Sequence, residues 1–323
     1  MPGKGRREAR SIFFPGCPRT NAQAPFLPKM PITIHHLART TPLTPFRSGA
    51  LIRRSMIALV AISLTLCGPV DAAPDVTEAE VEEMVEAMVT EFRIRHDAVR
   101  HWEPAVYPDD NTAQPTGRTA LVALAMLEAG EPAQSEKLAE ALQWIAENPA
   151  NGTYAIAVRL MVWCRMPEEY RPLANAELRR LLDRFSLEAG GWDYIPEPRP
   201  WLVDQSLTQY ALQAIADAHE AGLTVPPRII DMVRNRFLAM QTEDGGWGYQ
   251  KATDTPRGSM TAAGLATLAL CERIRPANAR TRQAVERSIS RAIAWLNRHF
   301  DPDTNPGHTP RMNAGSGKDG DYW

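Results

Sequence analysis

Helical segments of two kinds alternate along the chain from residue 77 onward. The segments that are apolar on nearly every side are 119–129, 155–164, 206–219 and 259–271. The segments with one apolar stripe and a charged opposite face are 135–147, 174–187, 227–241 and 282–300. A helix that is apolar all round is buried, whereas an amphipathic helix buries one face. The alternation therefore predicts an all-α fold in two layers, with enclosed inner helices and outer helices that face solvent.

A further helix is predicted ahead of this alternation. Thr77 followed by Glu80 forms a capping box, in which each residue satisfies a backbone N–H group of the other. An apolar stripe at helical spacing follows and comprises Val81, Met84, Val85, Met88, Val89 and Phe92. The two signals together predict that a helix begins at about residue 77.

A phrase rich in glycine and aromatic residues occurs twice. Gly-Gly-Trp-Asp-Tyr occupies residues 190–194, and Gly-Gly-Trp-Gly-Tyr follows 55 residues later at 245–249. An apolar inner segment comes after each phrase, which indicates a repeat architecture. Glycine permits tight turns with positive φ. We expect Trp192 and Trp247 to fill the space between adjacent repeats.

The second copy carries a family resemblance. Residues 237–247 read Phe-Leu-Ala-Met-Gln-Thr-Glu-Asp-Gly-Gly-Trp, with Gln241 three residues after a leucine and Gly246-Trp247 beyond it. This resembles the QW-type repeat of the squalene cyclase and prenyltransferase α/α toroids. Within that family, the chain resembles an exported bacterial type. Gly191 and Trp192 belong to a shortened copy without the glutamine. Over residues 77–323 the resemblance implies an α/α toroid of helical hairpins, in which the glutamine ties the outer-helix end to the next loop.

The last residues resemble a loop that precedes a further inner helix. Residues 315–323 read Gly-Ser-Gly-Lys-Asp-Gly-Asp-Tyr-Trp, and no inner segment follows 282–300. An outer helix without its inner partner leaves apolar surface exposed. We therefore expect a toroid that is incomplete at its C-terminus, either because the chain is a fragment or because the ring is open.

The chain divides into three predicted regions. Residues 1–55 hold ten Lys/Arg and one acidic residue without a helical or strand period, and are expected to be a disordered or mis-assigned extension. Residues 56–72 follow Arg53-Arg54 with a short apolar run and small residues, which is typical of a secretory signal peptide. Cleavage between Ala72 and Ala73 would release residues 73–323, the toroid domain, to the periplasm or the exterior. A transit peptide or an unstructured tail is the alternative.

The net charge argues against nucleic-acid binding by the mature chain, and the length of the apolar run argues against a transmembrane span. The whole chain has a net charge of −2 and residues 1–55 account for +9, so the remainder carries −11. Nucleic-acid binding needs a basic face, and we expect none. The apolar run at 57–66 is too short to span a bilayer, so the mature chain has no expected transmembrane span.

No complete catalytic motif is present in the sequence. The resemblance implies an Asp-x-Asp-Asp acid cluster for a terpene cyclase of class II, or Asp, Cys and His zinc ligands for a protein prenyltransferase. The chain has no such acid cluster, and Cys271 has no suitable histidine beside it. We therefore expect no metal and no cofactor. Cys164 and Cys271 lie in apolar segments, where buried free thiols or one disulfide are the alternatives.

The loops before the inner helices supply the candidate site residues. Parallel inner helices gather these loops at one end of the ring, where polar and aromatic groups would line the mouth of a cavity. The candidates are Asp193, Tyr194, Asp204, Gln205, Tyr249 and Asp254. The structural alternatives are that Asp204 caps its helix and that Asp193 holds its turn.

Three function classes remain open, and whether the protein is an enzyme remains open with them. The favoured one is a binding or scaffold module of the cell envelope with a small-molecule or protein ligand. The second is a terpenoid cyclase or prenyltransferase-like enzyme, which rests on the resemblance. The third is a polysaccharide-active (α/α) barrel enzyme, which requires paired carboxylates and aromatic platforms.

Overall fold

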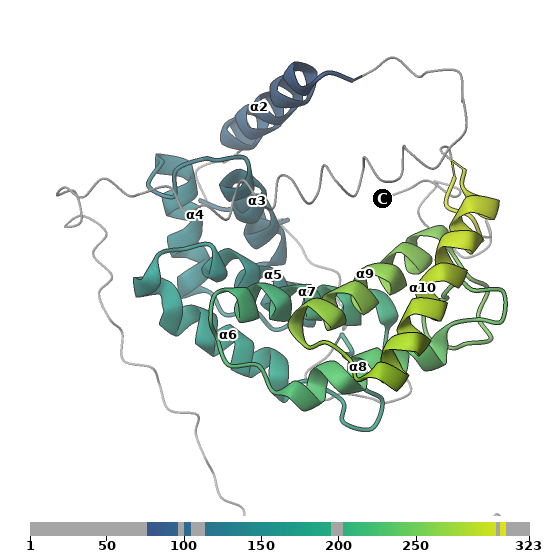
Figure 1. Ribbon diagram of the computed structural model, residues 1–323. Coiled ribbons are helices and arrows are strands. Elements are labelled where there is room, and N and C mark those ends of the chain that lie inside the picture. The colour runs from purple at the N-terminus through teal and green to yellow at the C-terminus, as the bar shows by residue number, and fades with distance from the viewer. Residues whose placement is uncertain (1–75, 96–99, 105–113, 195–202, 302–303, 308–323) are drawn as a thin grey trace, which may run out of the picture. The chain divides into compact units, whose positions relative to one another are not determined.

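The computed structural model describes residues 76–95, 100–104, 114–194, 203–301 and 304–307, all within one unit that spans Gly68–Trp323. The helices are α2 (Glu78–Arg95), α3 (Gly117–Glu128), α4 (Glu136–Glu147), α5 (Thr153–Cys164), η2 (Glu168–Tyr170), α6 (Arg171–Asp183), α7 (Gln205–Glu220), α8 (Pro227–Met240), α9 (Gly258–Ile274) and α10 (Ala279–His299). No strand occurs in these residues (Figure 1), so the all-α prediction is confirmed. The predicted extension 1–55 and signal peptide 56–72 lie outside the described residues.

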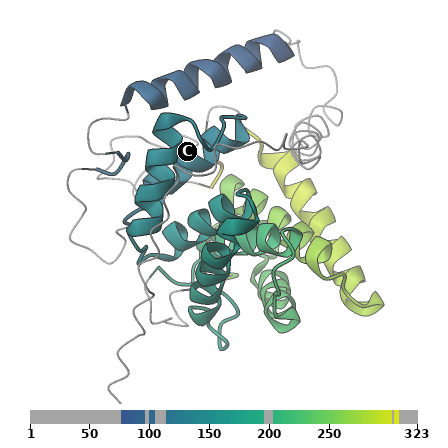
Figure 2. The same ribbon diagram turned by 90° about the vertical axis from the view of Figure 1, so that its left-hand side faces the viewer.

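The helices form the two layers that the alternation predicts. The inner helices α3, α5, α7 and α9 pack side by side in chain order, and α4, α6, α8 and α10 lie outside them (Figure 1, Figure 2). The outer helix α6 packs against both α5 and α7, so it covers the groove between two inner helices. The described residues of α3 and α9 make no extensive contact with each other, so the inner row is an open arc.

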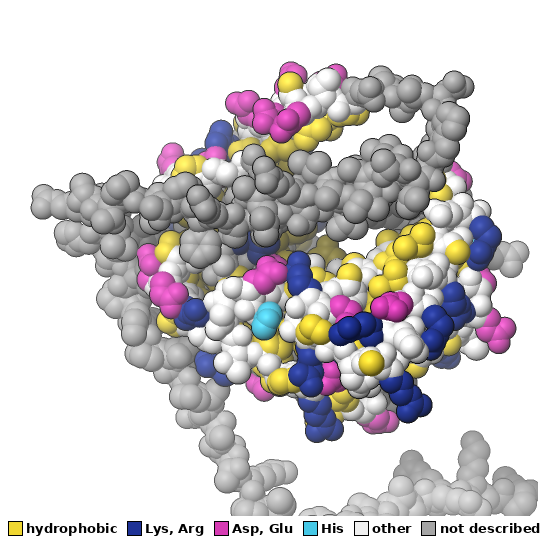
Figure 3. All heavy atoms as spheres, viewed as in Figure 1, with side chains coloured by type: hydrophobic (Ala, Val, Ile, Leu, Met, Phe, Trp, Pro, Cys, Tyr) yellow, Lys and Arg dark blue, Asp and Glu magenta, His cyan; other side chains and the backbone are white. Residues whose placement is uncertain are grey.

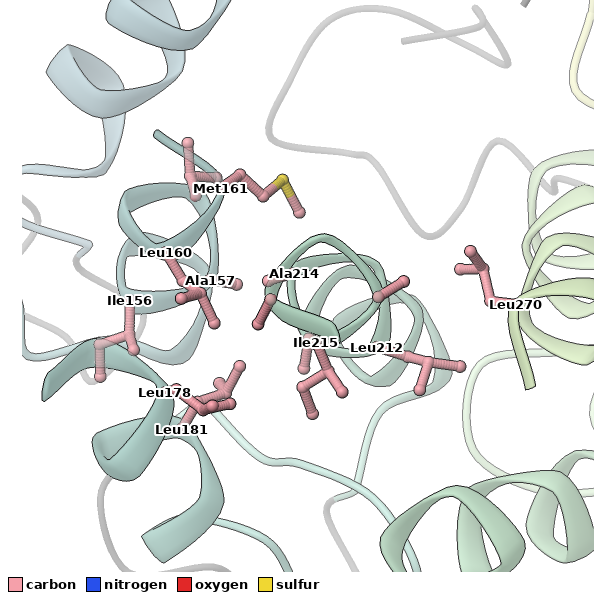
Figure 4. Packing of buried hydrophobic residues seen from close by; sticks show 14 of the residues in the cluster. Ile156, Ala157, Leu160, Met161, Leu178, Leu181, Leu212, Ala214, Ile215 and Leu270 are labelled. Carbon is pink, nitrogen blue, oxygen red and sulfur yellow. The ribbon is translucent and has the colours of Figure 1, made fainter. Parts of the chain in front are cut away.

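The centre of the core lies between α5, α6 and α7. Figure 4 shows Ile156 and Leu160 of α5, Leu178 and Leu181 of α6, and Ile215 of α7 directed into this space. All five side chains are buried. Burial of such apolar side chains is the main favourable contribution to folding, so these three helices are expected to stabilise the arc most.

The prediction that every inner helix is enclosed is right for α5 and α7 and wrong for α3 and α9. On α3, Leu121 is 50% exposed. On α9, Ala262, Ala266 and Ala269 form an exposed stripe. The physical reason is position, because the helices at the two ends of the arc have an inner neighbour on one side only.

The start of α2 confirms the predicted capping box. The Thr77 N–H group donates to Glu80 Oε2 at 2.7 Å, and the Glu80 N–H group donates to Thr77 Oγ1 at 3.2 Å. The first of these bonds is the largest cause that lowers the pKa of the Glu80 carboxyl. The reciprocal pair satisfies two backbone donors that the helix itself leaves free.

Trp192 and Trp247 join the outer layer to the inner layer with the same pair of contacts. Their indole N–H groups donate to carbonyl oxygens at or near the end of the preceding outer helix, Leu181 at 2.7 Å and Phe237 at 2.9 Å. Their backbone N–H groups donate to hydroxyls near the start of the next inner helix, Thr208 and Thr261, each at 3.2 Å. Both indoles are fully buried. The two tryptophans therefore pack between the outer and the inner layer.

A third copy, which the glycine phrase does not reveal, centres on Trp102. Its indole N–H group donates to the Phe92 carbonyl at 3.1 Å, and its backbone N–H group donates to Thr119 Oγ1 at 3.1 Å. Two residues before the tryptophan, Arg100 has a φ of 68°, where the other copies have Gly190 at 73° and Gly245 at 106°. Because an arginine occupies this left-handed position, the copy is hidden in the sequence. It makes α2 the outer helix of the first described repeat.

The side chain of Gln241 joins three segments. Its amide Nε2 donates to the Gly245 carbonyl at 2.8 Å and to the Ser288 carbonyl at 2.9 Å. Its Oε1 accepts a hydrogen bond from the Ser288 hydroxyl at 2.9 Å. One amide thus connects the end of α8 to the following loop and to α10.

The close packing of Trp247 against α9 requires a glycine at position 264. A Cβ atom on Gly264 would lie 2.5 Å from two atoms of the Trp247 ring. We expect Gly264→Ala to lower the free energy of unfolding by about 1–2 kcal/mol, because overpacking outweighs the helix propensity of alanine. Urea unfolding measures this change. Ala266→Gly, at an exposed position of the same helix, reports propensity alone at about 1 kcal/mol. A Gly264→Ala protein as stable as the wild type would contradict the described contact.

Candidate functional site

The loops of successive repeats meet at the N-terminal ends of the inner helices. The N–H group of Gln205, the first residue of α7, donates to the Tyr249 carbonyl in the next loop at 3.0 Å. The hydroxyl of Thr153, the first residue of α5, donates to the Asp193 carbonyl at 2.6 Å. Each of these helix starts is therefore attached to the loop of the following repeat, and the candidate residues lie at one end of the inner layer.

Three tyrosine rings, Tyr154, Tyr194 and Tyr210, form what we call the tyrosine cluster. The centroid of the Tyr154 ring lies 5.7 Å from that of Tyr194 and 5.1 Å from that of Tyr210, both edge to face. The Tyr154 hydroxyl is 2.8 Å from Ser206 Oγ, which donates to Asp204 Oδ1 at 2.6 Å. Tyr210 is 39% exposed, so the cluster reaches the solvent.

The environment keeps the hydroxyls of Tyr154 and Tyr194 protonated. Burial raises the pKa of Tyr154 above its ordinary value. Burial also raises the pKa of Tyr194, and the negative charge of Asp204 raises it further. At neutral pH these hydroxyls can donate and accept hydrogen bonds but do not act as bases.

The candidate carboxylates at this end hold the backbone. Asp204 caps α7, since its Oδ1 accepts the Leu207 N–H group at 3.0 Å. The Oδ1 of Asp193 accepts the N–H group of Tyr194 at 2.6 Å, and the Asp193 residue is only 1% exposed. The capping alternative is confirmed for Asp204, and the turn-holding alternative fits Asp193.

The other three candidates have different surroundings. Gln205 is buried; its Nε2 donates to the Gly248 carbonyl at 3.0 Å, while its Oε1 meets no hydrogen-bond donor among the described residues. The Tyr249 ring lies 4.9 Å from the Arg257 guanidinium carbon, in a cation–π contact. Asp254 Oδ2 accepts the N–H groups of two residues in its own loop, at 2.8 and 2.9 Å. Of the three, only Tyr249 offers an aromatic face beside the tyrosine cluster.

Tyr154, Ser206 and Tyr210 were not among the sequence candidates, because they lie inside helical segments rather than in loops. Two signals could have revealed them. Ser206 and Tyr210 are four residues apart and therefore share a face of α7. Tyr154 follows Gly152 at the start of α5, so an aromatic residue comes soon after glycine here as in the two glycine phrases.

Among the described residues, the remaining reactive groups form neither a metal site nor an activated thiol. No group of three His, Cys, Asp or Glu side chains there is placed to hold a metal ion. Cys164 and Cys271 are free thiols, and burial raises the pKa of each to about 12. A thiol with so high a pKa is a poor nucleophile at neutral pH. Within the same residues, every helix is too short or too polar to cross a membrane.

The comparisons with known proteins concern the architecture. No protein-family model and no curated protein sequence matches the chain. A variant of the type II terpene cyclase MstE from Scytonema with merosterolic acid A is similar in structure, at 17% identity over 71% of this chain and 67% of that chain, with a TM-score of 0.46. Another variant, with geranylgeranyl dihydroxybenzoate, has 17% identity over 70% and 65% and a TM-score of 0.47. A D-mannose isomerase has 11% identity over 73% and 75% and a TM-score of 0.46.

The fold is an α/α toroid. This statement rests on the alternating inner and outer helices of the described residues. The chain spans about two thirds of the length of the terpene cyclase chains it resembles. What those proteins bind or convert is a property of those proteins, because one fold supports many functions.

Proposed function

We propose that this chain is a binding module that receives its ligand at the tyrosine cluster. The observation that carries the proposal is the contrast between the aromatic and the acidic groups at this end of the arc. Rings from α5, α7 and the loop between α6 and α7 converge and reach the solvent through Tyr210. Asp193 and Asp204, in contrast, are occupied by backbone N–H groups.

Tyrosine suits a binding surface for physical reasons. It offers a large, rigid apolar face with a polar tip and loses little conformational entropy on binding, which explains its enrichment at interfaces. The Tyr154–Ser206–Asp204 chain of hydrogen bonds fixes the central ring before a ligand arrives. A preorganised ring lowers the ordering cost of binding.

We also propose that the module acts outside the cytoplasm, in the periplasm or the exterior. This proposal rests on the sequence of residues 56–72, which has the features of a signal peptide. We assign residues 237–247 to a QW-type repeat, and the contacts of Gln241 and Trp247 support that assignment.

Calorimetric titration of the full chain tests the binding proposal with one probe from each ligand class. The probes are cellohexaose, geranylgeraniol and a mixture of random hexapeptides. We expect heat of binding with at least one probe, and a loss of affinity of about tenfold or more in Tyr210→Ala, since truncating an aromatic anchor costs about 1–2 kcal/mol or more. Phe300→Ala removes a ring that is more exposed than Tyr210, 71% against 39%, at the end of α10 and is expected to leave the affinity unchanged.

Two outcomes would overturn the proposal. One is an equal loss of affinity in Tyr210→Ala and Phe300→Ala, which would place binding elsewhere. The other is conversion of a probe into product by the wild-type chain, detected by mass spectrometry, because a binding module leaves its ligand unchanged.

A further inference from the structure

A hollow of about 240 Å³ lies where α7 ends, α8 begins and α9 ends. Its apolar lining includes Val225, Ile230 and Ile274, and its polar lining consists of His219 and Arg275. Sites for small ligands are typically concave and mostly apolar, with a few polar groups that fix the orientation of the ligand. We call the space between these five residues the junction hollow.

The junction hollow is separate from the tyrosine cluster. The cluster lies near the start of α7, whereas His219 is in the last turn of this helix. Because an α-helix rises 1.5 Å per residue, His219 lies about 14 Å beyond Tyr210 along the helix axis. A ligand in the junction hollow therefore makes no use of the tyrosine rings.

The guanidinium of Arg275 is held in place while its two terminal nitrogens stay available. Its Nε donates to the two carboxylate oxygens of Asp231, at 3.2 and 3.0 Å. Arg234 Nη1 donates to Asp231 at 2.8 Å, and Arg234 Nη2 donates to the Arg275 carbonyl. Neither terminal nitrogen of Arg275 has an acceptor among the described residues, and the side chain is 48% exposed. Two parallel N–H groups of a guanidinium match the two oxygens of a carboxylate.

The rest of the lining offers one further donor and an apolar floor. The exposed ring of His219 makes no hydrogen bond to another described residue, and an imidazole always carries at least one N–H group. Ile230 is 0% exposed, and Val225 and Ile274 are half-buried. These three aliphatic side chains offer no partner to a polar group. A ligand that fits this lining is therefore acidic at one end and apolar elsewhere.

The helices next to the junction hollow are basic, although residues 56–323 carry a net charge of −11. α8 contains three arginines and one aspartate, and α10, which begins shortly after Arg275, contains five arginines and one glutamate. Figure 3 shows basic side chains gathered over the side of the arc that α8 and α10 form. The positive potential of such a face favours the approach of an anion.

We propose that the junction hollow binds a small monocarboxylate with a compact apolar body. The carboxylate accepts hydrogen bonds from the terminal nitrogens of Arg275, with the His219 ring beside it, and the apolar body covers the aliphatic floor. The volume lies below the range of about 300–1,000 Å³ that is usual for drug-sized ligands, which limits the apolar body to one ring or a short chain.

NMR of the full chain labelled with ¹⁵N, titrated with benzoate, tests the site. The amide signals of His219, Ile230 and Ile274 are expected to shift together along one saturating curve, with a Kd of about 1 mM or lower. Benzamide carries the same ring without the charge. It is expected to bind about tenfold more weakly or not at all, because the charge-assisted hydrogen bonds to Arg275 are lost.

Two matched variants separate contact with Arg275 from the general effect of charge. Arg275→Gln is expected to weaken benzoate binding by about tenfold or more. Arg273→Gln removes the same charge two residues away, from a side chain that is 50% exposed and pairs with Glu220 outside the lining of the hollow. Its expected effect is less than about twofold, because charges that do not touch the ligand are screened. Far-UV circular dichroism verifies that both variants keep their helices.

Four outcomes would overturn the proposal. They are the absence of a saturating shift at benzoate concentrations up to about 20 mM, shifts confined to other parts of the chain, benzamide binding as tight as that of benzoate, and equal losses in Arg275→Gln and Arg273→Gln. Tyr210→Ala is expected to bind benzoate like the wild type, so these results are independent of ligand binding at the tyrosine cluster.

Discussion

Replacing Glu177 by alanine is expected to lower the free energy of unfolding by about 3–5 kcal/mol, because it leaves a buried arginine without its counter-ion. Arg159 of α5 and Glu177 of α6 are 4% and 5% exposed, and Arg159 Nε donates to Glu177 Oε1 at 2.6 Å. The same guanidinium donates to the carbonyls of Ile145 at 2.8 Å and Asn148 at 2.5 Å. Burial lowers the pKa of Arg159, and the charge of Glu177 raises it again. Without Glu177, burial and the positive charge of Arg180 both disfavour the charged guanidinium, and no carboxylate offsets them.

Urea unfolding of Glu177→Ala measures this cost against two controls. Glu168→Ala breaks a pair with Arg171 in which the glutamate is 80% exposed, and its expected effect is at most about 1 kcal/mol. Arg159→Leu combined with Glu177→Leu removes both charges, so it is expected to recover much of the lost stability. A Glu177→Ala protein within about 1 kcal/mol of the wild type would show that the pair is not desolvated as described.

Trp247→Ala is expected to cost about 3–5 kcal/mol, the range for removing a fully buried large aromatic side chain. The indole is 0% exposed, and its loss would leave the Phe237 carbonyl without its indole donor. The ring fills the space in which a Cβ atom on Gly264 would lie, 2.5 Å from two ring atoms, so a smaller side chain at position 247 would leave a cavity against α9. The loss would therefore loosen the contact between α8 and α9.

The comparison variant for Trp247 is Trp144→Ala on α4. The Trp144 ring is partly exposed and packs on His101 with 4.5 Å between ring centroids. Because less apolar surface returns to water, its replacement is expected to cost about 1–2 kcal/mol. Equal effects of the two replacements in urea unfolding would contradict the structural role given to Trp247.

Most of the architecture could be predicted because its signals are local. The Thr77–Glu80 box, the glycines before Trp192 and Trp247 and the alternation of apolar and striped segments each depend on residues close in sequence. Trp102 could not be found this way, since Arg100 takes the left-handed conformation that glycine usually signals. The prediction that α3 and α9 are enclosed was wrong for another reason. Both have the composition of inner helices, but enclosure depends on neighbouring helices, which composition does not report.

The sequence predicted where the candidate residues lie in the fold, but not which contacts their side chains make. The parallel inner helices bring the loops with Tyr194 and Tyr249 to one end of the inner layer. The spacing of the segments in the sequence predicts this arrangement. Loop position also drew attention to Asp193 and Asp204, whose carboxylates are occupied by the backbone. The rings of Tyr154 and Tyr210 join the cluster only through packing between α5 and α7, and tertiary packing is not encoded in a local pattern.

The most direct test of the central claim is NMR of the full chain with ring-labelled tyrosine, titrated with the probe that shows heat of binding. Binding at the tyrosine cluster predicts that the ring signals of Tyr154, Tyr194 and Tyr210 shift together along one titration curve. Tyr170, whose ring stacks on Trp163 at 5.9 Å between centroids at the other end of α5, is predicted not to move. A probe that shifts Tyr170, or that binds without shifting the three cluster signals, would contradict the account.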